Sequence, residues 1–489
     1  MHLLFSLHLP LLPLQALRPS WSDPGAYAVL EAGRVVVASA EAQSLGVHPG
    51  MRGAGASAVA PDASLLDRDA AREQAAIDAA VLALYRFTPD IAREPDAGLL
   101  LDVGPSLRLF GGVRPLVRQV AGALDRLGLS VNIGVAPTAT GAWLLARRPR
   151  MRQSGLRRRV LQRSTLAREL DRLPCALLPA ARPHEEWLVG VGAEALGALR
   201  GLPRAGLLRR TSTQLADALD RAYGDSTEMH RWLAIPETFS ASLETYERVE
   251  HAEALLEGAA RLLLQMAGWL TVRQLAVSAF TLFLVHERGR AAIAPTAMVV
   301  ALAEPAWHDD HLVRLLRERL AKLELSAPVI GLRLEATQVQ PMAPANLTLF
   351  PEPGGNPADM RRLMELLVAR LGPGKVMAPA PAADHRPEVC NHWTPATLKR
   401  QAFPRDEEPL ARPFWLLKKP IRLLMREQRP FYGSPLVLIS GPERVEGGWW
   451  DDATALRDYY VAQGTDASCY WIYQERGGEM QWFLHGLFG

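Results

Sequence analysis

Three aspartates around one short apolar run are the first residues of this chain that could do chemistry. Asp90, Asp96 and Asp102 all lie within residues 88–103, and the last part of that stretch is almost entirely apolar. Carboxylate oxygens are the ligands that hard divalent cations prefer, and a pair of such cations can promote phosphoryl transfer. Asp96 and Asp102 share a face, however, only if one strand runs unbroken from Pro95 to Asp102.

A run of arginines forms a second group. Residues 147–163 contain eight arginines and no acidic residue. Such a run could follow a nucleic-acid backbone and would then lose affinity steeply with salt. We take Arg147, Arg148, Arg157 and Arg158 as candidate DNA-binding residues, and a solvated basic linker is the alternative interpretation.

The elements that must position these groups follow from the hydrophobic pattern. Residues 99–103 form a buried strand between Pro95 and Gly104–Pro105, and residues 3–9 form a first strand. A helix is expected over residues 113–127 and a strand over 130–135. Helix and strand patterns then alternate from 252 to 335, in a βαββαβ-like order.

Length and composition limit the possible class of protein. The 489 residues suffice for several domains, and a net charge of +3 favours an anionic partner only weakly. Cys175, Cys390 and Cys469 are far apart and odd in number, which favours a reducing compartment. The apolar N-terminus lacks the basic start of a secretory signal, and no stretch is long enough to span a membrane, so we expect a cytoplasmic protein.

The stretch 88–103 resembles the central palm strand of Y-family (translesion) DNA polymerases. In that family a Ser/Thr-Pro pair precedes a hydrophobic-Asp-Glu-x-x-Leu-Asp motif whose adjacent acidic residues serve the catalytic metal site. Thr88-Pro89 and Leu101-Asp102 match this motif, but Ala97 and Gly98 stand at the two acidic positions. Asp96 lies one residue away, and strand alternation would point it to the wrong face.

Three more segments resemble the same family in the same order. Residues 3–17 fit the first palm strand, residues 35–51 the fingers motif and residues 132–148 the last palm motif. The fingers motif keeps its turn glycines and packing residues, and the last palm motif keeps Gly134 and Pro137. The positions that would contact metal or triphosphate have instead become Ser6, Ala40, Gln43, Ala139 and Trp143.

The resemblance implies a multi-domain α+β fold (α/β in the broad sense) with a small β-rich C-terminal module. The expected parts are a palm at 1–165 with fingers inserted at about 20–80, a helical thumb at 166–237, a little finger at 238–342, a clamp-binding peptide with a helix and linker at 343–385, and a C-terminal interaction region at 386–489. In the thumb, Gly190 and Gly192 look like a helix-hairpin-helix, where backbone N–H groups bind a DNA phosphate.

A short peptide follows the expected little finger. Asn346, Leu347, Thr348, Leu349 and Phe350 resemble the bacterial sliding-clamp-binding motif, whose first residue is usually Gln. Such a peptide would dock its Leu and Phe side chains into an apolar pocket. A strand edge is the alternative interpretation.

The last hundred residues hold six of the twelve tryptophans, which indicates a folded module. We expect most of its aromatics to form a core and some to anchor a partner. His385, Cys390 and His392 lack the spacing of a metal site.

The order of the segments resembles the non-catalytic Y-family homologues of the bacterial SOS response. This implies no enzyme activity, no cofactor and no metal, with DNA, the sliding clamp (beta subunit), an error-prone C-family polymerase and a RecA-like protein as partners. Two alternatives stay open. One is an active translesion polymerase that uses Asp90, Asp96 and Asp102, and the other is a regulatory DNA-binding protein without clamp contact.

Overall fold

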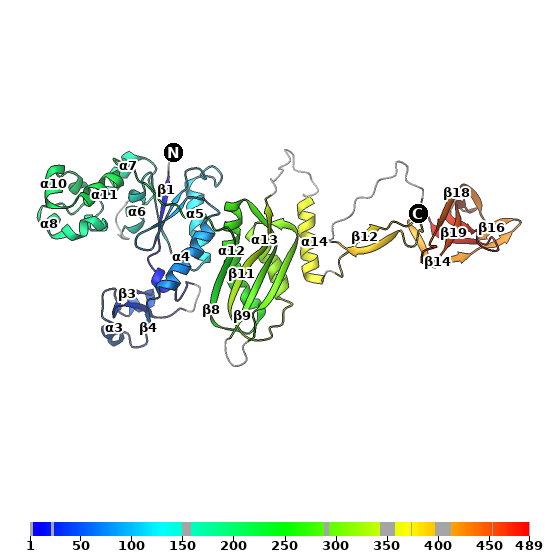
Figure 1. The fold of residues 1–489 in the computed structure, drawn as a ribbon, viewed down its shortest axis with the longest axis horizontal. Coiled ribbons are helices and arrows are strands. Elements are labelled where there is room, and N and C mark those ends of the chain that lie inside the picture. The colour runs from blue at the N-terminus through cyan, green and yellow to red at the C-terminus, as the bar shows by residue number, and fades with distance from the viewer. Residues whose placement is uncertain are drawn as a thin grey trace. The chain divides into compact units, whose positions relative to one another are not determined.

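The computed structural model describes residues 3–20, 24–148, 158–287, 293–342, 357–372, 374–396, 412–451 and 453–488. The chain divides into two compact units, Met1–Pro351 and Glu352–Gly489. The fold is α+β with several sheets, and the second unit is rich in strands, as the sequence predicts (Figure 1). None of the described helices combines the length and the apolar character that a membrane crossing requires.

The first sheet is antiparallel, in the order β5-β6-β1-β7. Its strands are β1 (Leu4–His8), β5 (Ile91–Glu94), β6 (Gly98–Asp102) and β7 (Asn132–Ala136). The strands expected at 3–9, 99–103 and 130–135 are therefore confirmed to within two residues.

One face of this sheet is a hydrophobic core. Phe5, Leu7, Leu99 and Leu101 alternate along β1 and β6 and are fully buried. Helices α4 (Ala70–Leu84) and α5 (Val113–Arg126) contribute to the same core. The helix expected at 113–127 is confirmed. Its buried apolar side chains recur at helical spacing and so face the core together.

The opposite face is partly covered by α6 (Ala139–Arg147), which begins at the Thr138 cap. Helix and sheet approach closely at Gly134 of β7, where an added Cβ atom would lie 2.1 Å from the carbonyl oxygen of Ala142. Only glycine permits this approach. The rest of this face carries Ser6, which is fully buried, and the cleft described below.

The hairpin between β5 and β6 corrects one step of the sequence argument. Asp96 and Ala97 lie in the turn, with φ of 56° and 53°, and β6 begins only at Gly98. Strand alternation therefore does not decide where Asp96 points, and the prediction that it lies on a strand facing the wrong side is wrong. The unbroken strand that would align Asp96 with Asp102 is absent.

A small sheet in the order β3-β2-β4 is inserted between β1 and α4. It consists of β2 (Tyr27–Glu31), β3 (Arg34–Ala38) and β4 (Ser64–Asp67), with α2 (Ala40–Ser44) and α3 (Gly53–Val59) packed on it. Gly46 and Gly50 both have positive φ, which explains why this motif keeps its turn glycines.

A helical segment follows the arginine run. It comprises α7 (Arg163–Leu170), α8 (Glu185–Gly190), α9 (Leu196–Arg200), α10 (Arg204–Arg210) and α11 (Thr213–Tyr223), with two short 3₁₀ turns at Cys175–Leu177 and Pro179–His184. Its core is continuous with the buried side of α6, which includes Trp143 and Leu144.

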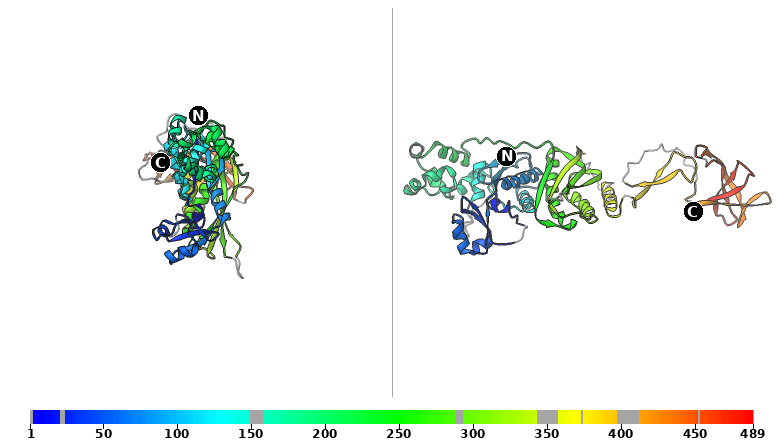
Figure 2. Two further views of the ribbon diagram at one scale, coloured as in Figure 1. Left: turned by 90° about the vertical axis from the view of Figure 1, so that its left-hand side faces the viewer. Right: turned by 60° about the horizontal axis from the view of Figure 1, so that its bottom comes forward.

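The second sheet has the order β10-β9-β11-β8 and confirms the expected βαββαβ order. Its elements are β8 (Ser240–Val249), α12 (Leu255–Arg273), β9 (Leu275–His286), β10 (Thr296–Ala306), α13 (Asp309–Leu320) and β11 (Val329–Pro341). Helices α12 and α13 share a core with one face of this sheet (Figures 1 and 2).

The helix α12 also packs directly on α4, next to the first sheet. At Gly268 an added Cβ atom would lie 2.0 Å from the carbonyl oxygen of Leu82. The buried carboxylate of Asp309 in α13 reaches the same region and pairs with Arg126 at 2.7 Å and with Arg86 at 3.8 Å. The two sheets are thus joined by a close helix contact and by a partly buried ion-pair cluster.

The second unit contains α14 (Pro357–Leu371), the hairpin of β12 (Met377–Pro381) and β13 (Asn391–Pro395), and a five-stranded sheet in the order β14-β21-β20-β19-β18. The strands of that sheet are β14 (Trp415–Arg422), β18 (Val437–Gly447), β19 (Ala455–Gln463), β20 (Cys469–Glu475) and β21 (Trp482–Leu487). A small sheet of β15 (Leu424–Arg426), β16 (Arg429–Tyr432) and β17 (Ser434–Pro435) accompanies it.

The aromatic residues of this unit fall into two groups. Tyr459 stacks on Trp471 with ring centroids 4.0 Å apart, and both are buried, which confirms the expected aromatic core. Trp415 and Trp449 are 70% and 72% exposed. Their role as partner anchors stays a prediction.

Candidate functional site

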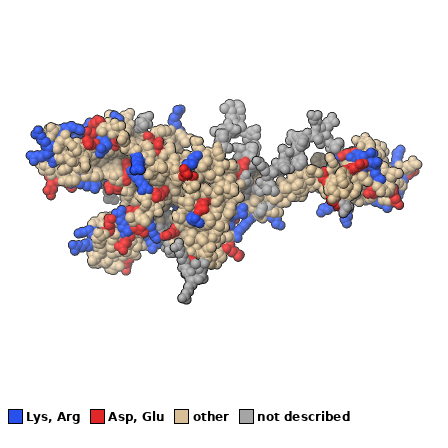
Figure 3. Space-filling model, viewed as in Figure 1, with Lys and Arg blue, Asp and Glu red and all other residues tan. Residues whose placement is uncertain are grey.

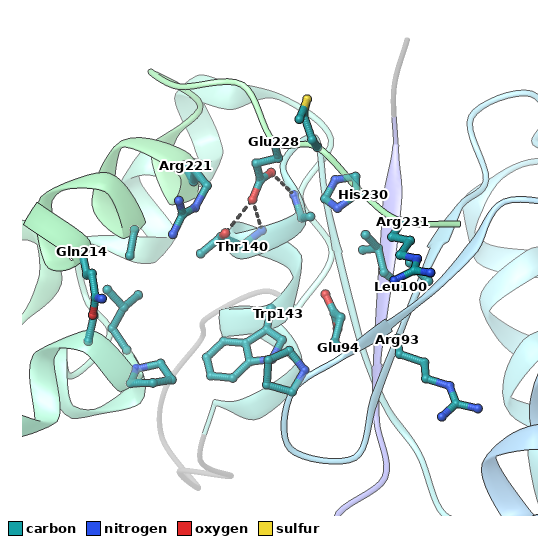
Figure 4. Close-up of a pocket in the computed structure, with 18 of the residues that line it drawn as sticks. Arg93, Glu94, Leu100, Thr140, Trp143, Gln214, Arg221, Glu228, His230 and Arg231 are labelled. Atoms are coloured by element: carbon teal, nitrogen blue, oxygen red, sulfur yellow. Dashed lines mark hydrogen bonds between the residues drawn. The ribbon is translucent and has the colours of Figure 1, made fainter. Parts of the chain in front are cut away.

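A cleft of about 1110 Å³ opens on the side of the first sheet that α6 only partly covers. Its walls come from β5, β6 and α6, from the helical segment, and from the connector at residues 227–231 (Figure 4). Since the resemblance places a metal site on this sheet, the polar side chains at the bottom of the cleft decide what chemistry is open to it.

Glu94, at the end of β5, is the acidic residue on the sheet floor of the cleft. The hydroxyl of Ser6 donates a hydrogen bond to Glu94 Oε2. Burial raises the pKa of Glu94 to about 8, although the Ser6 hydrogen bond and the charge of Arg147 act in the opposite direction. At neutral pH this carboxyl group is therefore mostly protonated and is a poor ligand for a divalent cation.

Arg147, at the end of α6, holds the β5–β6 turn. Its Nη2 donates to the carbonyl oxygens of Pro95 and Asp96 at 2.6 and 3.0 Å, and its guanidinium lies 4.1 Å from the centre of the Trp143 ring. Burial lowers the pKa of Arg147 to about 10. Its Nε and Nη1 are buried without a hydrogen-bond partner. Arg147 is thus placed to support the hairpin, and its predicted DNA contact is not tested by this geometry.

Glu228 comes from the connector and caps the start of α6. Its carboxylate accepts hydrogen bonds from the backbone N–H groups of Ala139 and Thr140, at 2.6 and 2.8 Å, and from the Thr140 hydroxyl at 2.5 Å (Figure 4). A helix N-terminus favours an anion, and here the anion belongs to the chain itself.

The three aspartates proposed for the rearranged metal site are not brought together. Asp90 and Asp102 lie near each other, and burial together with the charge of Asp102 raises the pKa of Asp90. Asp96 lies at the other end of β6, and five residues of strand span roughly 13–16 Å. In the part of the chain that the structure describes, no three His, Cys, Asp or Glu side chains are grouped as a metal site would require. That statement also covers His385, Cys390 and His392.

The other candidate residues lie elsewhere. Gly190 and Gly192 lie at the α8–α9 turn, where both are exposed and Gly192 has a φ of 73°. At the start of α9, however, the N–H groups of Leu196 and Gly197 already donate to Leu173 and Asp171. Lys and Arg side chains gather over the end of the unit that carries α8 and α10 (Figure 3). A phosphate contact at this turn stays a prediction.

Arg148 and Arg158 line a second cleft beside β7. Arg157 and the peptide of Asn346, Leu347, Thr348, Leu349 and Phe350 lie outside the described residues. Glu94 and Glu228 were not predicted from the sequence, because their roles depend on contacts with Ser6 and with α6 that are distant in sequence.

Comparison with known proteins places these features in a family context. Residues 17–147 match the impB/mucB/samB family. The chain is 27% identical to Protein ImuB of Caulobacter vibrioides over 476 residues, which cover 91% of this chain and 100% of that protein. It is 30% identical to DNA polymerase IV 2 of Mesorhizobium japonicum over 224 residues, or 45% of this chain and 50% of that protein.

Solved structures with similar folds include an insertion ternary complex of Dbh DNA polymerase, with a TM-score of 0.39 and 15% identity, covering 68% of this chain and 98% of that one. DinB from Sulfolobus solfataricus gives a TM-score of 0.38 and 17% identity, covering 69% and 98%. The similarity to ImuB covers 91% of the chain and so extends into the second unit.

Proposed function

Because the chain is an ImuB-like homologue of Y-family DNA polymerases, we propose that it is a non-catalytic scaffold of translesion synthesis. It binds DNA, is tethered to the sliding clamp through residues 346–350, and recruits an error-prone C-family polymerase together with the RecA-like protein ImuA. It acts in the SOS response, in the cytoplasm, and needs no cofactor.

The observation that carries the proposal is the Ser6–Glu94 pair on the first sheet. Ser6, Ala97 and Gly98 occupy the positions at which the resemblance expects metal-site carboxylates. The nearby Glu94 bonds to Ser6 and has a pKa of about 8, so it supplies little negative charge at neutral pH. Among the described residues no group of three His, Cys, Asp or Glu side chains could hold a metal ion, and a pair of divalent cations needs several ionised carboxylates to hold it against a triphosphate.

The Glu228 cap supports the same conclusion. The N-terminus of α6 is a place where a phosphate group could bind, and a carboxylate of the connector already occupies its N–H groups. Glu228 therefore fixes the connector to α6 and leaves these N–H groups unavailable to a nucleotide phosphate.

Primer extension tests the absence of catalysis. With a primed template, dNTPs and either Mg²⁺ or Mn²⁺, we expect extension about a thousandfold or more below that of an active Y-family enzyme, because loss of even one charge-stabilising group costs about 10²–10³ in kcat. Robust extension contradicts the proposal. If that extension disappears when Asp90, Asp96 and Asp102 become Asn, the alternative of a rearranged metal site is correct.

A titration with the sliding clamp tests the tether. Changing Leu347, Leu349 and Phe350 to Ala should weaken binding about a hundredfold or more, since each fully buried side chain of this kind contributes about 1.5–3 kcal/mol. The matched control changes Met360 and Leu363 to Ala, two half-exposed apolar residues of α14, and should bind like the wild type. A wild-type protein that fails to bind the clamp removes this part of the proposal and favours a regulatory DNA-binding protein.

A further inference from the structure

A second cleft, of about 1250 Å³, lies beside the edge strand β7 and is separate from the cleft at Glu94. Its walls come from the start of α5, the residue that follows α6, and residues 158–165. The lining contains no acidic residue and includes five arginines, namely Arg114, Arg118, Arg148, Arg158 and Arg159.

The fold holds part of this wall in place. The backbone at Arg158–Val160 continues the first sheet, because Val135 N–H donates to Arg158 O and Val160 N–H donates to Val135 O, both at 2.9 Å. The guanidinium of Arg158 donates to Asn132 Oδ1 at 2.7 Å. Arg158 and Arg159 therefore start from a fixed strand edge, which reduces the entropy that a ligand contact would have to overcome.

Arg148 supplies an independent indication of a ligand. Its Nε and Nη1 atoms are buried and have no hydrogen-bond partner. A buried guanidinium N–H group without an acceptor is costly, so a shift of this side chain toward an oxyanion held in the cleft would be favoured.

The start of α5 adds positive potential to the same cleft. Val113 and Arg114 line the cleft in the first turn of this 14-residue helix, whose N-cap is Gly112. No side chain caps this end, and its first turn has no acidic residue. An arginine here is unfavourable for the helix dipole, and an anion bound in the cleft would reverse that effect.

We propose that this arginine cleft binds the phosphate backbone of a DNA strand. The proposal rests on the DNA binding proposed above and assigns part of it to a surface built from the start of α5, Arg148 and residues 158–165. The lining has no aromatic side chain on which a base could stack. We therefore expect binding to depend on the phosphate charges and not on the base sequence. Five arginines in one cleft match several successive phosphates better than one small anion.

The test uses the full chain and a fluorescent single-stranded 20-mer of mixed sequence. Arg114 and Arg118 are exposed, so changing both to Ala leaves the core intact. We expect affinity at low salt to fall about tenfold, and the slope of log K against log salt to lose about 0.7 per lost phosphate contact. Arg114→Lys with Arg118→Lys should keep most of the slope, because the charge remains.

The matched control changes Lys418 and Lys419, exposed residues of β14, to Ala and so removes the same charge from the other unit. If the Arg-to-Ala variant has the affinity and salt slope of this control, the cleft assignment is overturned while the scaffold function stands. If inorganic pyrophosphate stabilises the wild type but not the Arg-to-Ala variant against heat, and the DNA slopes are equal, the cleft binds a free anion and the DNA assignment is again overturned. Loss of DNA binding by the wild type itself removes both DNA proposals and leaves the clamp titration to be judged separately.

Discussion

Replacing Glu94 by Gln is expected to stabilise the protein at pH 8 and to leave its stability nearly unchanged near pH 4. Glutamine keeps the shape of the side chain and an oxygen that can accept the Ser6 hydrogen bond. It also removes the ionisable group. Burial raises the pKa of Glu94 from 4.5 to about 8, so ionising this carboxyl group destabilises the folded protein.

The sign follows from proton linkage. The folded state keeps the Glu94 proton up to about pH 8, whereas the unfolded chain releases it near pH 4.5. Relative to the Glu94→Gln variant, the wild type is therefore equally stable below pH 4.5 and loses stability as pH rises toward 8. At about 1.4 kcal/mol per pKa unit, and with a reduction for the partial exposure of the side chain, the difference should reach about 2–3 kcal/mol.

Denaturant unfolding of both proteins at pH 4.5, 6 and 8 measures this difference. Glu186→Gln is the control, because it makes the same side-chain change at an exposed position, on α8. A Glu94→Gln protein that is no more stable than the wild type at pH 8 would show that the Glu94 carboxylate is well solvated or ionically paired.

The substitution Gly268→Val should separate the second sheet from the first. The Cβ atom of any residue larger than Gly would lie 2.0 Å from the Leu82 carbonyl oxygen, so α12 must move away from α4. The displaced contact includes backbone atoms, which cannot rotate aside, and we expect a loss of about 3 kcal/mol. Heating should then separate the unfolding of the second sheet from that of the first, whereas we expect the two sheets of the wild type to unfold together.

Gly122→Ala is the control for this substitution. Gly122 also lies in a helix, α5, but an added Cβ atom meets nothing within 4 Å. Since Ala favours a helix over Gly by up to about 1 kcal/mol, this variant should be neutral or slightly more stable. A single, unshifted transition for Gly268→Val would mean that α12 and α4 are not packed together in solution.

Local pattern was enough to locate three strands of the first sheet, the helix α5 and the order of helices and strands in the second sheet. The apolar pattern of residues 3–9 predicted β1 to within one residue at each end, and the helical spacing of residues 113–127 predicted α5. Both succeed because burial imposes a period of 2 on strands and of 3.6 on helices, whatever lies against them.

The contacts of the candidate site could not be predicted from local sequence patterns. The Asp96 argument failed because a left-handed turn, set by two residues with positive φ, interrupts the strand. Glu94 meets Ser6 across 88 positions, and no local pattern encodes such a contact. The arginine run was noticed, but Arg114 and Arg118 join it only through the packing of α5 beside β7.

The Glu228 carboxylate competes with free phosphate compounds for the N-terminus of α6. The carboxylate is tethered to the site that it fills, so it acts there at an effective concentration of the order of millimolar or above. A free phosphate compound would have to exceed that concentration, or bind through additional contacts, before it displaced Glu228. Fluctuations in cellular nucleotide levels below that range should therefore leave this end of the helix unaffected.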